Sequence, residues 1–291
     1  MARRGPLNVS DFTTLRTEVE AGVGSIWLTR ADEYNTITPA LRDELAVAID
    51  AHDADPKVRV ILLRAEGPAF CAGYGLDWST AAQAREAGEE RVWDSVADYR
   101  MMSRFVATYL KLWYASKPTI AAVQGWCIAG GTDMVLCADL IVAGEGASFG
   151  YPPSRAWGTP TTAMWVYRMG LERAKRYLLT GDEIPADEAA RIGLVLETVP
   201  DQRLQEHAFA LARRMARVPT TQLVMLKLLC NQTVENMGLA SSRTLGTVFD
   251  GIARHTQEGL DFVARAEEAG FRQAVRERDD PFGDYGSRRR G

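Results

Sequence analysis

Two short apolar segments, each running into a glycine-containing turn, constrain the fold of this chain most strongly. Residues 58–64 (VRVILLR) lead to 69–74 (AFCAGY), and residues 119–123 (TIAAV) lead to 124–133 (QGWCIAGGTD). Glycine permits a tight turn at a strand end, and the start of a following helix presents backbone N–H groups that lack intrahelical acceptors. If the two turns meet, they would supply paired donors to a carbonyl oxygen, with the acid Asp133 nearby.

The order of the expected elements predicts an α/β fold. Strands are expected at 24–29, 58–64, 119–123 and 140–143. A helix is expected from Pro39, because Thr38 is a good N-cap and proline suits the first helical position. Strands that alternate with helices at this spacing are typical of βα units on parallel sheets.

From about residue 171 onward the pattern is almost entirely helical. The main predicted helices cover 204–216, 220–236 and 243–269. We therefore predict a core of residues 1–200 and a helical region of residues 201–291.

Composition excludes several classes of function. The chain has 291 residues, of which 46% are hydrophobic, and its net charge of −4 gives no reason to expect a nucleic-acid partner. No apolar run is as long as the ~18–20 residues of a membrane span, and the N-terminus lacks an apolar signal core. We therefore expect a cytoplasmic protein without a membrane span.

The cysteines do not indicate a metal site. Cys71, Cys127, Cys137 and Cys230 form no C-x-x-C pair and have no histidine close in sequence. Buried thiols in a reducing compartment are the expected state, with a disulfide as the alternative.

Several motifs, taken together, resemble the crotonase (enoyl-CoA hydratase/isomerase) superfamily. They are AFCAG at 69–73, KPTIAAVQG at 117–125, AGG at 129–131, CAD at 137–139, ASFG at 147–150, LLTGD at 178–182 and AARIGLV at 189–195. The resemblance covers about residues 15–275. It implies a spiral of stacked ββα units, a helical C-terminal trimerisation region, and homotrimers that often pair into hexamers. It also implies a coenzyme A thioester as ligand, with no other cofactor and no metal.

The resemblance assigns the oxyanion-hole donors to the backbone N–H groups of Tyr74 and Gly130. It places Asp133 where the family has its first catalytic glutamate. A carboxylate one helical turn from Gly130 can act as a general base towards water or an α-proton. The alternative is that Asp133 only stabilises the start of its helix, since acids are favoured there.

The family's second catalytic glutamate has no counterpart here, because its position is taken by Pro153. Tyr151 and Arg155 are candidates for supplying a proton or a charge instead, with packing as the alternative for each. A hydration shared between two carboxylates is therefore not predicted from the motifs, and one carboxylate better suits a double-bond shift.

For coenzyme A, the resemblance points to Arg30 towards the phosphates and to backbone of the first glycine loop at Ala69, Ala72 and Leu76. Asp32 stands where the family often has a second basic residue. The acyl pocket is expected to draw on a stripe of large apolar residues near the two turns, whose alternative role is ordinary core packing. Its candidates are Trp93, Met101, Met102, Phe105, Trp126 and Pro153, with Tyr109 and Trp113 in the same helical pattern.

The sequence thus predicts an acyl-CoA-processing enzyme of hydratase/isomerase type with Asp133 as its acid/base group. A non-catalytic acyl-CoA-binding protein is the alternative that the missing glutamate favours. Carbon–carbon bond hydrolysis and decarboxylation are further alternatives. The charged segment 271–285 is expected either to contact a neighbouring subunit or to be a frayed tail.

Overall fold

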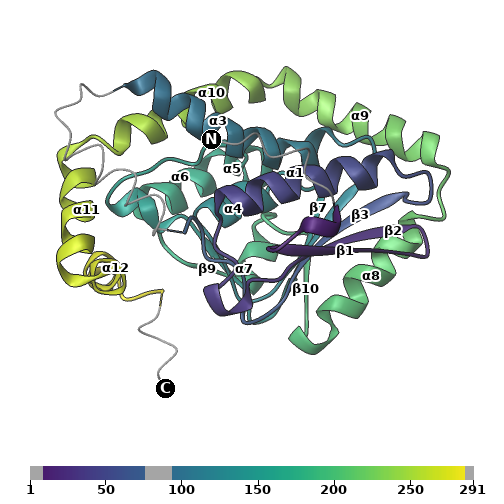
Figure 1. Ribbon diagram of the computed structural model, residues 1–291, viewed down its shortest axis with the longest axis horizontal. Coiled ribbons are helices and arrows are strands. Elements are labelled where there is room, and N and C mark those ends of the chain that lie inside the picture. The colour runs from purple at the N-terminus through teal and green to yellow at the C-terminus, as the bar shows by residue number, and fades with distance from the viewer. Residues whose placement is uncertain (1–8, 76–93, 286–291) are drawn as a thin grey trace.

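The computed structural model describes residues 9–75 and 94–285, and its elements enclose one mixed α/β core (Figure 1). A six-stranded sheet has the order β1-β2-β3-β5-β7-β10, in which β1 and β2 are antiparallel and the remaining neighbours are parallel. Its strands are β1 (Leu15–Glu20), β2 (Val23–Leu28), β3 (Val60–Ala65), β5 (Thr119–Val123), β7 (Leu140–Gly144) and β10 (Glu197–Val199).

A second sheet has the order β4-β6-β8-β9. Its strands are β4 (Ala69–Cys71), β6 (Trp126–Ile128), β8 (Ser148–Gly150) and β9 (Ile184–Pro185). The pairs β3–β4, β5–β6 and β7–β8 each give one strand to each sheet, so the chain winds as stacked ββ turns. This confirms the predicted α/β class with parallel sheets.

Helices surround the sheets and make up the C-terminal part of the chain. In the described residues they are α1 (Pro39–Ala54), α3 (Ser95–Tyr114), α4 (Gly130–Val135), α5 (Trp165–Met169), α6 (Leu171–Thr180), α7 (Ala186–Arg191), α8 (Leu204–Met215), α9 (Thr220–Asn236), α10 (Leu239–Ala253), α11 (Gln257–Ala269) and α12 (Phe271–Asp279). Short 3-10 turns lie at η1 (Val9–Asp11), η2 (Ala31–Glu33), η3 (Pro152–Arg155), η4 (Asp201–Arg203) and η5 (Asp280–Phe282). Figure 1 shows α9 and α10 along one side of the molecule and α8 on the other side of the larger sheet.

The first helix begins as the sequence predicts. The Thr38 hydroxyl accepts a hydrogen bond from the Leu41 N–H at 3.2 Å, and Pro39 occupies the first helical position. Leu41, Leu45 and Ile49 face the core, as their spacing predicts.

One predicted helix is wrong in its extent. Residues 243–269 form two helices rather than one, because α10 ends at Ala253 and α11 begins at Gln257. Thr256 is the N-cap of α11 and accepts a hydrogen bond from the Gly259 N–H at 3.2 Å. A threonine cap competes with helix continuation, which explains the break.

Helix α8 belongs to the packing of the larger sheet. Its apolar face (Leu204, Ala208, Ala212) forms a cluster with Val60 and Ile120 of the sheet. Residues beyond 200, where the predicted helical region begins, therefore still pack on the sheet of the core. No helix of the described ranges is long and apolar enough to cross a membrane.

Candidate active site

The smaller sheet brings the two glycine turns together. Strands β4 and β6 are parallel neighbours, with Cys71 opposite Cys127, so the chain leaves both strands at the same edge. Gly73 has φ of +91°, and a Cβ placed on it would lie 3.7 Å from the Gly130 nitrogen. Strand pairing thus places side by side two segments that lie more than fifty residues apart in sequence.

The Tyr74 backbone is oriented by a bridge to Ile37. The Ile37 N–H donates to the Gly73 carbonyl at 2.8 Å, and the Gly75 N–H donates to the Ile37 carbonyl at 2.9 Å. In a parallel bridge of this kind the central residue's own N–H points away from its partner strand. The Tyr74 N–H is therefore directed away from Ile37.

Gly130 begins α4, so its N–H has no acceptor within the helix. The preceding N-cap, Ala129, has φ of 52° and ψ of −123° and makes no side-chain cap. A non-glycine residue at positive φ is strained, and such strain often accompanies functional turns.

The glycines of this turn allow a close approach that no side chain would permit. A Cβ on Gly130 would lie 2.6 Å from Cε2 of Tyr74 and 2.9 Å from Cδ1 of Ile37. A Cβ on Gly131 would lie 2.5 Å from the Cys71 carbonyl oxygen. The helix start is thereby held against the end of β4.

Asp133 lies in α4 one turn after Gly130 and is fully buried. Its Oδ2 accepts from the Thr161 N–H at 3.2 Å and the Thr161 hydroxyl at 3.0 Å. Its Oδ1 accepts from the Thr162 N–H at 3.3 Å and the Thr162 hydroxyl at 3.1 Å. Burial raises the pKa of Asp133 to about 7, although these four hydrogen bonds oppose the rise.

The threonine segment that holds Asp133 is itself fixed by α10. The Thr159 hydroxyl donates to the Gly246 carbonyl at 2.8 Å, and the Thr247 hydroxyl donates to the Thr161 carbonyl at 3.2 Å. A Cβ on Gly246 would lie 2.5 Å from the Pro160 carbonyl oxygen, so α10 packs closely on this segment.

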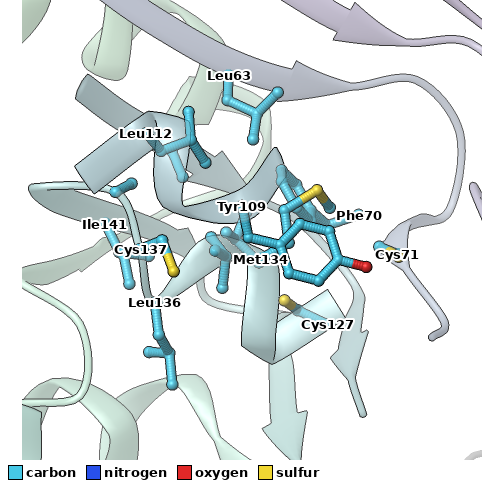
Figure 2. Close-up of a cluster of buried hydrophobic side chains, with 14 of the residues drawn as sticks. Leu63, Phe70, Cys71, Tyr109, Leu112, Cys127, Met134, Leu136, Cys137 and Ile141 are labelled. Atoms are coloured by element: carbon cyan, nitrogen blue, oxygen red, sulfur yellow. The ribbon is translucent and has the colours of Figure 1, made fainter. Parts of the chain in front are cut away.

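Three tyrosines lie close to Asp133. The Tyr109 hydroxyl donates to the Tyr74 hydroxyl at 3.1 Å, and the Tyr151 hydroxyl donates to the Thr159 carbonyl at 2.7 Å. Burial raises the pKa of all three phenols, and the negative charge of Asp133 raises it further. Figure 2 shows Tyr109 with its oxygen at the edge of an otherwise apolar cluster. These hydroxyls stay protonated and can donate hydrogen bonds.

The structure places several acyl-pocket candidates near these tyrosines. Met102 and Phe105 are fully buried on α3, and the Phe105 ring packs edge-on against the Tyr74 ring at 5.4 Å. Met101 is partly buried against the same core. Trp93 lies outside the described residues.

Two other candidates, Trp126 and Pro153, lie in β6 and in η3. The Trp126 ring lies 6.1 Å from the ring of Tyr285 in the C-terminal segment. Pro153 lies in η3, and its Cβ is 3.1 Å from the position of a Cβ on Gly158. Proline carries no acid or base group here, as the sequence indicates.

The coenzyme A candidates lie around the first turn. Arg30 donates to the Thr36 carbonyl at 2.7 Å and pairs with Glu33. The Ala72 N–H donates to the Tyr34 carbonyl at 3.1 Å. The Ala69 carbonyl accepts from the Asn35 side-chain amide at 2.9 Å. Leu76 lies outside the described residues.

Arg155 belongs to a different cluster from Asp133. Its buried guanidinium donates to both carboxylate oxygens of Asp284 at 2.8 Å and to Asp279 at 3.1 Å, and it lies 3.9 Å over the Phe282 ring. The C-terminal segment is therefore packed against its own chain rather than frayed. These contacts assign the Arg155 charge to the docking of the C-terminal segment.

The sequence did not single out Asp250 and Arg254 of the α10 region. The Arg254 guanidinium donates from Nε and Nη2 to Asp250 Oδ2 at 3.2 and 2.8 Å, and both side chains are about 6% exposed. Their i, i+4 spacing was a visible signal for a pair on one helix face. Where that helix face would pack depends on the fold and could not be read from the spacing.

The cysteines are free. Cys71, Cys127 and Cys137 are buried, and burial raises the pKa of Cys71 to about 12, so it remains a thiol. Cys230 on α9 is exposed, contrary to the expectation of burial. The described residues contain no cluster of three or more histidine, cysteine or acidic side chains that could hold a metal ion.

Comparison with known proteins agrees with this geometry. A family model described as enoyl-CoA hydratase/isomerase matches residues 18–273. The chain belongs to the enoyl-CoA hydratase/isomerase family.

Solved structures and a curated relative support the assignment. A crystal structure of an enoyl-CoA hydratase from Mycobacterium smegmatis superimposes with a TM-score of 0.92 and is 43% identical, covering 97% of this chain and 99% of that one. An enoyl-CoA hydratase/isomerase from Xanthobacter autotrophicus Py2 gives a TM-score of 0.84 at 27% identity, covering 93% and 99%. The hydroxycinnamoyl-CoA hydratase-lyase of Pseudomonas fluorescens is 30% identical over 208 residues, 70% of this chain and 73% of its own.

Proposed function

We propose that this protein acts on an acyl-CoA thioester, whose carbonyl oxygen is bound by the N–H groups of Tyr74 and Gly130. Removal of an α-proton, or addition of water to an α,β-double bond, puts negative charge on that oxygen. Two fixed donors stabilise this charge, and one such donor typically contributes ~2.7–4 kcal/mol to lowering the barrier. The adjacency of the two turns supports this role.

Asp133 is the proposed acid/base group, and its environment is the observation that carries the proposal. A general base works best when its pKa lies near the working pH. Burial brings the pKa of Asp133 to about 7, whereas an exposed aspartate at a helix start would be ionised well below that. Because Pro153 supplies no second acid or base group, a double-bond shift is the activity that one carboxylate supports best.

A non-catalytic acyl-CoA-binding role is the second candidate. Each oxygen of Asp133 already accepts two hydrogen bonds, Oδ2 from Thr161 and Oδ1 from Thr162, as a purely structural carboxylate would. A substrate hydrogen bond would then have to replace or share one of these contacts. This candidate predicts thioester binding without turnover.

The name of the Pseudomonas relative adds a third possibility for the substrate. A hydratase-lyase acts on hydroxycinnamoyl-CoA there. Addition of water followed by carbon–carbon cleavage is therefore included among the reactions to be assayed, alongside decarboxylation.

We also propose a homotrimer, with a hexamer built from two trimers as the larger form, acting in the cytoplasm. Helices α9 and α10 carry a set of exposed large apolar residues: Met225, Leu226, Leu228, Leu229, Leu245, Val248, Phe249 and Ile252. Many exposed large apolar side chains on two successive helices are typical of a subunit interface.

The test is Asp133→Asn assayed with a mixed acyl-CoA library by mass spectrometry of the products. Turnover should fall by about 10²–10⁴-fold, the usual contribution of general acid–base catalysis, while thioester affinity stays near that of the wild type. Thr108→Val is the control, because the buried Thr108 hydroxyl donates to the Arg104 carbonyl of its own helix. Unchanged turnover in Asp133→Asn would refute the assignment, and binding without turnover by the wild-type protein would support the binding role instead.

A further inference from the structure

Asp250 reaches the same part of the molecule as Asp133, from a different element. Its face of α10 is the one that packs on residues 159–161 through Gly246 and Thr247. Asp250, Tyr151 and Pro153 all approach Gly158. A Cβ built on Gly158 would lie 3.9 Å from Asp250 Oδ1, 3.8 Å from the Tyr151 hydroxyl oxygen and 3.1 Å from Pro153 Cβ. Asp250 therefore supplies a carboxyl group near Pro153, which itself has no acid or base group.

Both carboxyl groups act on the same two phenols. The charges of Asp133 and Asp250 each raise the pKa of Tyr74 and of Tyr151. The two acids and the two tyrosines therefore form one electrostatically coupled group, although Asp133 and Asp250 are more than a hundred residues apart in sequence.

Arg254 binds one side of Asp250. Both of the hydrogen bonds that its guanidinium gives to Asp250 go to Oδ2, while Oδ1 is the oxygen near Gly158. Arg254 is fixed in turn by Met102, whose sulfur lies 2.9 Å from Nη2, and by the Trp157 ring at 5.5 Å. A buried ion pair contributes little to stability by itself, because desolvation offsets the attraction. The burial of the Asp250–Arg254 pair near the tyrosines is instead consistent with a role in catalysis.

We propose that Asp250 is a second catalytic residue, which delivers a proton to the substrate carbon that Asp133 does not serve. The inference rests on the proposed acyl-CoA activity. Burial raises the pKa of Asp250, Arg254 and a hydrogen bond from the Thr159 backbone lower it, and the nearby charge of Asp98 raises it, with a net rise. Burial and the charge of Asp98 therefore favour the protonated form that a proton donor requires.

The step balances for a β,γ-unsaturated thioester. Asp133 takes the α-proton, and the C–H electron pair passes into the dienolate, whose oxygen is bound by the two backbone N–H groups. Asp250 gives its proton to the γ-carbon as the thioester carbonyl re-forms and the double bond moves to the α,β position. Asp133 ends protonated and Asp250 ionised, and proton exchange with solvent restores both.

The test separates proton removal from proton delivery. In D₂O, Asp250→Asn should still exchange the substrate α-proton for deuterium, because Asp133 is intact, whereas product formation should fall by about 10²–10⁴-fold. Asp250→Asn/Arg254→Gln repeats the measurement without an unpaired buried cation. Asp139→Asn is the matched control, since Asp139 also pairs with a buried cation, Lys227 of α9, at 2.9 Å.

Each result decides the proposal. Retained α-exchange with lost product formation in Asp250→Asn or the double variant, and near-wild-type rates in Asp139→Asn, support it. Unchanged product formation in the double variant would overturn it, as would an equal loss of exchange and product formation, which indicates a structural role. Failure of the wild-type protein to form any product would refute the proposed function itself and this inference with it.

Discussion

Replacing Thr161 by valine should raise the pKa of Asp133 without changing the shape of the site. Valine keeps the volume of threonine but removes the hydroxyl that donates to Asp133 Oδ2 at 3.0 Å, while the Thr161 N–H remains at 3.2 Å. A hydrogen bond to a charged group is worth about 1.5–3 kcal/mol. Since ~1.4 kcal/mol corresponds to one pKa unit, the pKa of Asp133 should rise by about 1–2.

The pH dependence of kcat/KM measures this rise. A general base must be ionised, so the rate should increase with pH through a limb near the pKa of Asp133, about 7 in the wild type. In Thr161→Val the limb should move to higher pH by about 1–2, and the rate at neutral pH should fall ~10-fold or more while recovering at high pH. A folded variant with an unmoved limb would refute the role of Asp133 as the base. The Thr108→Val control should leave the limb in place, because its hydroxyl is bonded within α3.

Three further results are expected. The pKa of Asp133 is about 7 in the folded protein, against an ordinary 3.8. Its protonated form therefore stabilises the fold below about pH 4, by on the order of 4 kcal/mol relative to the ionised form. This contribution is lost as pH rises through 7. Urea unfolding should show this fall in the wild type and a flatter profile in Asp133→Asn; parallel profiles would contradict it. Gly130→Ala should reduce turnover by about 10²–10³-fold, measured by product formation, since its Cβ would meet the Tyr74 ring at 2.6 Å. Leu245→Glu/Phe249→Glu should convert the oligomer to monomers in light scattering, because both residues are exposed on α10; an unchanged mass would locate the interface elsewhere.

The sequence predicted those parts of the fold that depend on local pattern. Apolar runs indicated β3 and β5, and the Thr38–Pro39 pair indicated the start of α1. The position of Asp133 one turn after Gly130 also followed from the sequence, because it depends only on helical spacing.

Features that depend on tertiary packing could not be predicted in this way. The threonine pair that holds Asp133 lies 28 residues away in sequence, and only the fold brings it there. Asp250 lies farther still, and an i, i+4 acid–arginine pair on a helix is usually a solvated surface pair. Arg155 is a sequence candidate for supplying a charge in place of the missing glutamate, but in the fold its guanidinium pairs with Asp279 and Asp284 of the C-terminal segment.

The most direct test of the account is deuterium exchange at the α-carbon of bound acyl-CoA thioesters in D₂O, followed by mass spectrometry. The measurement needs no knowledge of the final product, since it reports only enolate formation between the Tyr74/Gly130 donors and Asp133. Exchange is expected with the wild-type protein and should be lost in Asp133→Asn at unchanged thioester affinity. Exchange that persists in Asp133→Asn, or its absence in the wild type across the library, would contradict the account.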